Sequence, residues 1–206
     1  MSEHSMYRWR RMSEQARADI LAQRQSNERP WHSPPHYEID SRIYLVTAAC
    51  FEHQPVIGYS PERMADFEQT LLAKCGEACE ALYAWTVLPN HYHFLAKASG
   101  VRELIRTLGQ MHGSTSYQWN SEERCRGRQV WFEAAETGMK SERHFWASFL
   151  YVLNNAVKHG YVTQWQDWPY CNAREWLNGV GREAALRLWH EYPIDEFGQD
   201  WDPPDL

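Results

Sequence analysis

The apolar positions after residue 42 divide the chain into stretches with strand-like and helix-like spacing. Ile43 to Phe51 is an apolar, β-branched run that is typical of a buried strand. Ala81 to Leu88 and His91 to Ala98 predict a second and a third strand, and Gln129 to Ala134 predicts a fourth. These runs alternate with helical patterns, so the chain contains both kinds of element.

Three helices are predicted between and after these strands. Ser60 and Pro61 supply an N-cap and a first-turn proline for a helix that continues to about Cys79. The apolar spacing predicts further helices from Val101 to about Ser121 and from Glu142 to His159. Strand-helix-strand-strand-helix-strand is the ferredoxin-like split βαβ order. We therefore expect an α+β fold with one antiparallel sheet, with helices on one face and the last helix on the other.

The two ends of the chain differ from this central part. Ser13 to Gln25 has the composition of a short helix, and the proline-rich run from Pro30 to His36 excludes regular structure. We predict an N-terminal extension over residues 1–40, a domain over 41–178, and a C-terminal helix with an acidic tail over 179–206. The extension is either an arm that contacts a ligand or a segment packed on the domain.

Composition places the protein among cytoplasmic proteins. The chain has no run of about 18 apolar residues and no secretory leader, so we expect no membrane association and no export. Its 5 cysteines lack paired metal-binding spacing, which favours reduced thiols.

A pair of histidines stands at the start of the third strand. Alternation along a strand directs His91 and His93 to one face, about 7 Å apart, while Tyr92 and Phe94 point to the other. Two imidazoles in this arrangement can bind one metal ion. Histidine pairs also occur on solvated strand faces, so a second element is needed to support a site.

The last predicted helix supplies that second element. Tyr151, Asn155 and His159 follow one another at intervals of four residues and therefore share a stripe on the helix. This stripe presents a hydroxyl and an amide oxygen together. Tyr117, on the preceding helix, has Ser121 rather than an amide four residues later and is interpreted as a surface or core residue.

These motifs resemble those of a known family. The run Pro89 to Leu95 resembles the HUH motif of single-tyrosine transposases, and Tyr151 to Val162 resembles the helix signature of their REP-associated branch. Two further pieces, Gly127 to Trp131 and Asp167 to Tyr170, occur in the expected order. The resemblance extends from about Tyr44 to Trp176. Leu88, Ala156 and Lys158 depart from the usual methionine, proline and arginine, and none of these changes removes a ligand.

The chemistry of the residues and the resemblance lead to the same site. Tyr151 is the expected nucleophile, and His91, His93 and Asn155 are the expected metal ligands. Mixed nitrogen and oxygen ligation suits Mn²⁺ and tolerates Mg²⁺, and Zn²⁺ remains an alternative on affinity grounds. His159 is a candidate additional ligand or proton acceptor.

The resemblance implies an enzyme that nicks and rejoins single-stranded DNA at palindromic hairpins through a 5′-phosphotyrosine. It also implies a bacterial, nucleoid-associated protein that acts as a monomer. Two alternatives remain open: a domesticated protein that binds DNA hairpins without cutting them, and a metal-dependent nuclease that uses water. Covalent linkage to DNA would distinguish the first interpretation from both.

Charge limits the expected mode of DNA binding. The net charge is −6, but residues 161–206 hold 3 basic and 9 acidic residues, so the rest of the chain is neutral. We therefore expect weaker non-specific DNA affinity than a basic relative would have. The predicted phosphate-binding residues are Arg124, Arg126, Arg128 and Lys158.

Overall fold

The computed structural model describes Gln15 and residues 42–194. Its contacts divide the chain into two compact units, residues 1–35 with 198–206 and residues 36–197. The sheet and the helices that cover it belong to the second unit. The helix predicted at 13–25, the proline-rich run and the acidic tail lie outside the described residues, and the domain boundaries at 40 and 178 stay predictions.

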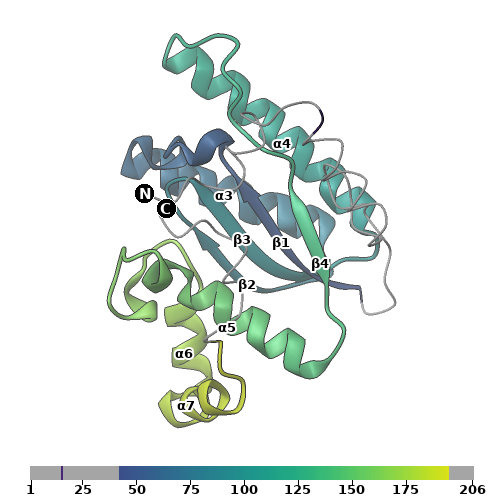
Figure 1. Cartoon of the computed structure of the whole chain (residues 1–206), viewed down its shortest axis with the longest axis vertical. Helices are drawn as coiled ribbons and strands as arrows, with labels where there is room; N and C mark the ends of the chain where they lie inside the picture. Colours follow the sequence, from purple (N-terminus) through teal and green to yellow (C-terminus); the bar gives the residue numbers. More distant parts are fainter. Residues whose placement is uncertain (1–14, 16–41, 195–206) are drawn as a thin grey trace. The chain divides into compact units, whose positions relative to one another are not determined.

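Four antiparallel strands form one sheet (Figure 1). They are β1 (Ile43–Ala49), β2 (Ala81–Val87), β3 (His91–Lys97) and β4 (Ala135–Gly138), in the order β2-β3-β1-β4. Two strands that are distant in sequence, β1 and β3, form the centre of the sheet. The strand that carries the histidine pair is therefore enclosed by a neighbour on each side.

Helices cover both faces of this sheet (Figure 1). The longer ones are α3 (Pro61–Ala78), α4 (Val101–Glu122) and α5 (Glu142–Lys158), followed by α6 (Ala173–Val180) and α7 (Arg182–Glu191). The short 3-10 helices among residues 42–194 are η1 (Phe51–His53), η2 (Ile57–Tyr59) and η3 (Trp165–Asp167). The predicted α+β class with a single antiparallel sheet is confirmed.

The alternation of side chains along the strands separates two cores. On one face Val46, Tyr92 and Phe94 are fully buried against α3 and α4. On the other face Leu45 and Leu95 pack with α5. Because His91 and His93 have the same parity as Leu95, they lie on the α5 face, as the alternation predicts.

Local capping signals fix the ends of α5. The side chain of Ser141 accepts a hydrogen bond of 3.1 Å from the backbone N–H of His144 and caps the first turn. At the other end Gly160 has a φ of 73°, and the N–H of Tyr161 donates to the carbonyl of Ala156. Glycine tolerates this left-handed conformation, so the helix ends where the sequence predicts.

The predicted fourth strand is wrong in its position. Residues 129–134 form only an isolated bridge, Trp131 with Cys50, while the regular strand is Ala135–Gly138. The cause lies in β1, which ends at Ala49 and turns into η1, where Glu52 and His53 have positive φ. A regular ladder needs a regular partner, so β4 pairs with the straight part of β1 despite its weak strand propensity.

The segment 168–172 covers the outer edge of β2. The amide of Asn172 accepts a 3.0 Å hydrogen bond from the N–H of Trp85 and donates a 3.0 Å bond to the carbonyl of Tyr83. The indole N–H of Trp168 donates to the carbonyl of Val87. These bonds satisfy strand groups that would otherwise stay open at an edge. The motif at 167–170 therefore has a structural role in this fold.

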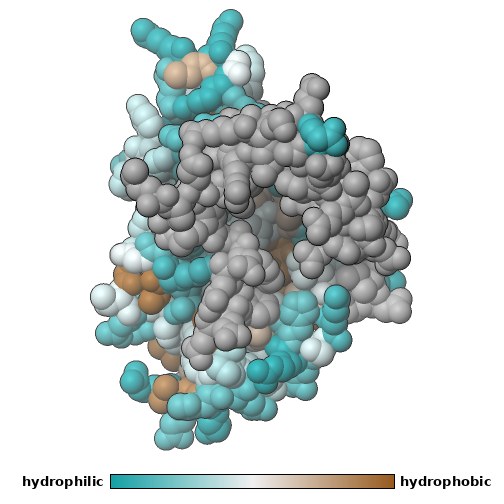
Figure 2. Space-filling model, viewed as in Figure 1, coloured by the Kyte–Doolittle hydropathy of each residue, from teal (hydrophilic) through white to brown (hydrophobic). Residues whose placement is uncertain are grey.

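Among residues 42–194, no helix combines the length and the apolar character needed to cross a membrane. The described residues on the face drawn in Figure 2 are mostly hydrophilic, and hydrophobic residues occur singly or in small groups. The larger exposed hydrophobic side chains include Tyr59 and Tyr117.

Replacing Asn172 by alanine is expected to lower the free energy of unfolding by about 1–3 kcal/mol. The substitution leaves the carbonyl of Tyr83 and the N–H of Trp85 without their partner at a buried position. Urea unfolding measures the effect, with the exposed Asn178→Ala on α6 as the matched control. Equal stability of the two variants would contradict the role assigned to Asn172.

Burial of His112 predicts a loss of stability in acid. Desolvation lowers the pKa of this histidine from 6.5 to about 4, and its Nε2 lies 2.9 Å from the hydroxyl of Tyr92. The unfolded chain binds a proton at His112 below about pH 6.5, whereas the folded chain does so only near pH 4. The stabilisation is therefore complete above pH 6.5 and is lost as the pH falls toward 4.

For this group we expect a loss of about 2 kcal/mol between pH 7 and pH 5. Unfolding curves of the wild-type protein and His112→Gln over this range isolate the contribution, because the other titrating groups are common to both. Parallel pH profiles for the two proteins would contradict the assignment.

Candidate functional site

The histidine pair is positioned by a tight turn between β2 and β3. The backbone N–H of Leu88 donates to the carbonyl of His91 (2.8 Å), which closes the hairpin around Pro89 and Asn90. Gly58 packs against this turn so closely that a Cβ atom there would lie 2.5 Å from Pro89 Cβ. The glycine thus permits η2 to support the start of β3.

Helix α5 places Tyr151 and Asn155 over the two histidines. Asn155 Oδ1 lies 3.0 Å from His91 Nε2, and the ring centroids of Tyr151 and His93 are 5.3 Å apart. The two histidine rings are themselves 5.0 Å apart. Side chains separated by about 60 residues in sequence therefore meet at one point on the α5 face of the sheet.

Each histidine has a second polar contact on its other ring nitrogen. His91 Nδ1 lies 2.7 Å from Asn90 Oδ1, and His93 Nδ1 lies 2.7 Å from Thr47 Oγ1. In both rings the Nδ1 atom is used in this way, so Nε2 is the nitrogen that can face a ligand. Metal-binding histidines in proteins have this arrangement, since the second bond orients the ring.

The side chains at this point are almost completely inside the protein. The exposed fractions are 2% for Tyr151, 1% for His91 and 0% for His93 and Asn155. Low exposure strengthens electrostatic interactions in the site because water screens them less. It also means that solvent or a ligand can reach Tyr151 only after a local opening.

Two further residues, Lys158 at the end of α5 and the C-cap residue His159, border the site. The ring of His159 lies 4.8 Å from that of His91, centroid to centroid, and the ammonium of Lys158 lies 5.1 Å from the ring centroid of Tyr151. Lys158 is exposed whereas Tyr151 is buried, so the cation stands at the outer side of the ring. The stripe predicted from the sequence does converge on the histidine pair.

The donor set fits a divalent cation. Asn90 Oδ1 accepts the hydrogen of His91 Nδ1, so His91 Nε2 carries a lone pair directed at Asn155 Oδ1. His91 Nε2 and Asn155 Oδ1, 3.0 Å apart, can both face one cation, whereas without a cation the Asn155 amide can turn so that Nδ2 donates to Nε2. Neighbouring ligands of an octahedral Mg²⁺ are also about 3 Å apart. In the described part of the chain no group of three His, Cys, Asp or Glu is arranged to hold a metal ion, so the amide of Asn155 would be the third ligand.

The predicted phosphate-binding arginines differ in solvent exposure and in ion pairing. Arg124 and Arg126 are exposed in the loop after α4. Arg128 is half-buried and forms an ion pair with Glu123 (2.7 Å), which lowers the pKa of that carboxyl. The same carboxylate pairs with Arg63 at 2.6 Å. Arg128 is therefore part of an internal charge network, and its positive charge is largely compensated.

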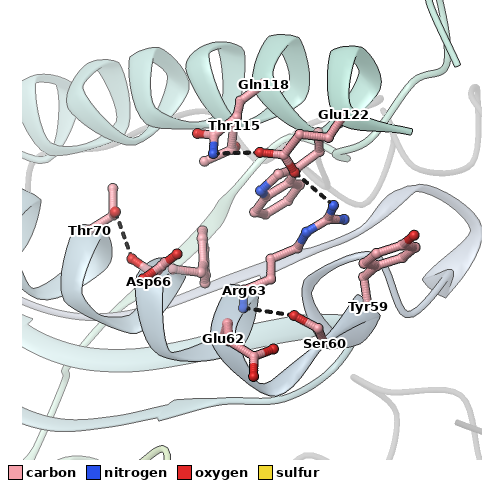
Figure 3. A pocket seen from close by; sticks show the side chains of 11 residues that line it. Tyr59, Ser60, Glu62, Arg63, Asp66, Thr70, Thr115, Gln118 and Glu122 are labelled. Carbon is pink, nitrogen blue, oxygen red and sulfur yellow. Dashed lines mark hydrogen bonds and ion pairs between the residues drawn. The ribbon is translucent and has the colours of Figure 1, made fainter. Parts of the chain in front are cut away.

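A pocket of about 250 Å³ lies between α3 and α4, on the face of the sheet opposite the histidines (Figure 3). Figure 3 shows the guanidinium of Arg63 directed at Glu122, with Tyr59 beside it. The carbon Cζ of Arg63 lies 4.3 Å from the ring centroid of Tyr59. Both partners of this ion pair line the pocket, which contains none of the residues of the histidine site.

Sequence reasoning missed Asn90 and Thr47 as contacts of the histidines. Asn90 is adjacent to His91 in sequence, and a Pro-Asn pair is readily explained by the turn alone. The sequence therefore gives no sign that the Asn90 side chain also contacts the His91 ring. Thr47 is brought to His93 by strand register, since the two residues pair across β1 and β3. Strand alternation alone does not predict this register, so only the structure reveals the contact.

Comparisons with known proteins give a sequence likeness and a fold. No protein-family model matches the chain. A REP-associated tyrosine transposase of Escherichia coli (strain K12) is 31% identical over 124 residues, which cover 56% of this chain and 61% of that protein. The match thus extends over about three fifths of the relative's length.

A solved structure of a REP-associated tyrosine transposase bound to a REP hairpin has the same fold. Its TM-score is 0.50 at 20% sequence identity, and the match covers 81% of this chain and 92% of that chain. The first comparison confirms the sequence resemblance to REP-associated tyrosine transposases that the motifs indicate, and the second confirms the fold.

Proposed function

We propose that this protein nicks and rejoins single-stranded DNA at palindromic hairpins, with Tyr151 as the nucleophile. The observation that carries the proposal is the meeting of Tyr151 and Asn155 on one helix with His91 and His93 on β3. The REP hairpin bound to the solved relative supports the choice of substrate. A bacterial, nucleoid-associated location in the cytoplasm follows from the same proposal.

In the forward step, the hydroxyl oxygen of Tyr151 forms a bond to the phosphorus and the bond from phosphorus to the 3′ oxygen breaks. The phenolic proton leaves to a base, and the 3′ oxygen acquires a proton. The product is a 5′-phosphotyrosine and a free 3′ hydroxyl. Attack by a 3′ hydroxyl on the phosphotyrosine reverses the step, so rejoining needs no external energy source.

His91, His93 and Asn155 would hold the divalent cation, Mg²⁺ or Mn²⁺. When bound, this ion neutralises charge on the non-bridging phosphate oxygens. The ammonium of Lys158 lies 5.1 Å from the centroid of the Tyr151 ring, at the exposed side of the site. His159 would serve as an additional ligand or as a proton acceptor.

The exposed Arg124 and Arg126 would contact the DNA backbone, together with Lys158. Arg128 has a smaller expected part because of its pairing with Glu123. Tyr151 and all three ligands lie in one chain, which is compatible with a monomer.

A second candidate function is hairpin binding without cleavage. The observation that favours it is the 2% exposure of Tyr151, since a nucleophile must reach its phosphate. A metal-dependent nuclease that uses water is a more distant alternative. Both lack a covalent intermediate.

Incubation with Mn²⁺ and end-labelled hairpin oligonucleotides tests the proposed reaction. The 3′-labelled strand should migrate as a protease-sensitive adduct on a denaturing gel, and the 5′-labelled strand should shorten. Tyr151→Phe should abolish both products, whereas Tyr117→Phe, at an 80% exposed tyrosine of α4, should retain them. Cleavage without an adduct would indicate water as the nucleophile, and binding without cleavage would indicate the non-cleaving binder.

Removing the charges of the arginines in the loop after α4 distinguishes those that bind DNA from the one that stabilises the fold. Arg124→Gln with Arg126→Gln should weaken DNA binding and reduce the slope of log affinity against log salt by about 1–2 units. Arg128→Gln should instead lower thermal stability, because Glu123 loses a partner. Fluorescence anisotropy over a salt series and thermal melts measure the two effects. An unchanged salt slope in the double variant would contradict the backbone contact.

A further inference from the structure

We infer that Asn90 is a positioning residue that holds His91 in the tautomer with its hydrogen on Nδ1. The consequence of this tautomer for DNA cleavage rests on the proposed function, but the tautomer itself does not. Asn90 is 5% exposed and immediately precedes His91 in the turn between β2 and β3. The nitrogen and the oxygen of its side-chain amide each have one hydrogen-bond partner. The two contacts together determine which nitrogen of His91 carries the hydrogen.

The first contact fixes the orientation of the amide. Asn90 Nδ2 lies 3.2 Å from the backbone carbonyl oxygen of His53. A carbonyl oxygen only accepts hydrogen bonds, so the amino group of Asn90 must be the atom on this side. The amide oxygen is therefore on the other side, toward His91. The assignment does not depend on distinguishing oxygen from nitrogen by shape.

The second contact fixes the histidine. Asn90 Oδ1 lies 2.7 Å from His91 Nδ1, and an amide oxygen also only accepts. The hydrogen of this bond must therefore be on Nδ1. In a neutral imidazole only one nitrogen carries a hydrogen, so Nε2 presents a lone pair.

This lone pair has a use whether or not a cation is bound. His91 Nε2 faces the amide of Asn155 at 3.0 Å, and Asn155 Nδ2 has no hydrogen-bond partner in the described part of the chain. With a cation, Nε2 and Asn155 Oδ1 both face the ion. Without one, rotation of the Asn155 amide allows Nδ2 to donate to Nε2. Both arrangements need the tautomer that Asn90 selects.

The partner of Asn90 lies in a strained turn. Glu52 has a φ of 55° and His53 a φ of 50°, backbone angles that residues other than glycine rarely adopt. The backbone of Asn90 is also fixed, since its carbonyl accepts a 2.7 Å bond from the N–H of Cys50. Strained backbone of this kind persists where surrounding contacts demand it and often serves a site. The turn at 52–53 thus directs the His53 carbonyl toward the amide of Asn90.

The contact between Thr47 and the second histidine, His93, does not determine which ring nitrogen carries the hydrogen. Thr47 Oγ1 lies 2.7 Å from His93 Nδ1, but a hydroxyl both donates and accepts. The tautomer of His93 is therefore not determined by Thr47. This contrast makes Asn90 the residue whose removal should have a distinct spectroscopic effect.

Nitrogen-15 NMR of histidine-labelled protein tests the inference directly. At pH 8.5, without metal or DNA, His91 should show a protonated Nδ1 and an unprotonated Nε2. The His91 signals are identified by their loss in His91→Gln. Asn90→Asp keeps the acceptor and should retain this tautomer, whereas Asn90→Leu should populate the form with the hydrogen on Nε2. Asn154→Leu, at a half-buried position of α5 outside the site, should leave the His91 signals unchanged.

Mn²⁺ titration of the same DNA-free proteins gives a second readout. Loss of a residue that orients a metal-binding histidine weakens metal affinity by about 10- to 100-fold. We expect such a loss in Asn90→Leu and wild-type affinity in Asn154→Leu. An Nε2-protonated His91 in the wild-type protein overturns the inference. So does an Asn90→Leu variant that keeps both the Nδ1–H tautomer and the Mn²⁺ affinity.

The result separates this inference from the proposed function. A wild-type protein with the Nδ1–H tautomer but no Mn²⁺ binding would support the role of Asn90 and contradict the metal-dependent reaction. If Asn90→Leu does not fold, the wild-type and Asn90→Asp spectra still decide the tautomer.

Discussion

The candidate site depends on one contact, the 3.0 Å approach of Asn155 Oδ1 to His91 Nε2. It joins the strand that carries the histidines to the helix that carries the tyrosine. The contact brings together two polar groups that are almost completely removed from solvent. Its geometry accommodates a cation between the two groups. Without a cation, it accommodates a hydrogen bond from the Asn155 amide to His91.

The rest of the fold creates the conditions for this contact. The sheet separates an apolar core under α3 and α4, which holds Tyr92 and Phe94, from the α5 face with the histidines. The first core stabilises the domain, so the second face can accommodate polar groups without losing the fold. At the edge of the sheet the amide of Asn172 replaces a neighbouring strand. This edge is therefore not open for pairing with another chain.

Much of this arrangement was predictable because it depends on short-range patterns. Alternation along β3 assigns His91 and His93 to one face, and the four-residue spacing on α5 aligns Tyr151 with Asn155. The position of β4 was not predictable, since it depends on where β1 becomes irregular. The contact of Thr47 with His93 depends on the register of two strands that are distant in sequence. The pairing of Arg128 with Glu123 depends on the conformation of the loop after α4, which residue spacing does not predict. Spacing alone predicted which face of each element the residues occupy. The resemblance to REP-associated tyrosine transposases also predicted that the two elements meet at one site, because its motifs combine residues that are distant in sequence.

The placement of Tyr151 and Asn155 on a single helix has a mechanical consequence. One turn of α-helix is stiff, so the two side chains cannot be displaced independently along the helix axis. A rigid-body shift of α5 that uncovers the hydroxyl also withdraws the amide from His91. Rotation of the Tyr151 side chain about its own bonds avoids this coupling. Local side-chain movement, with the helix in place, is therefore the way to expose the Tyr151 hydroxyl while the site stays assembled.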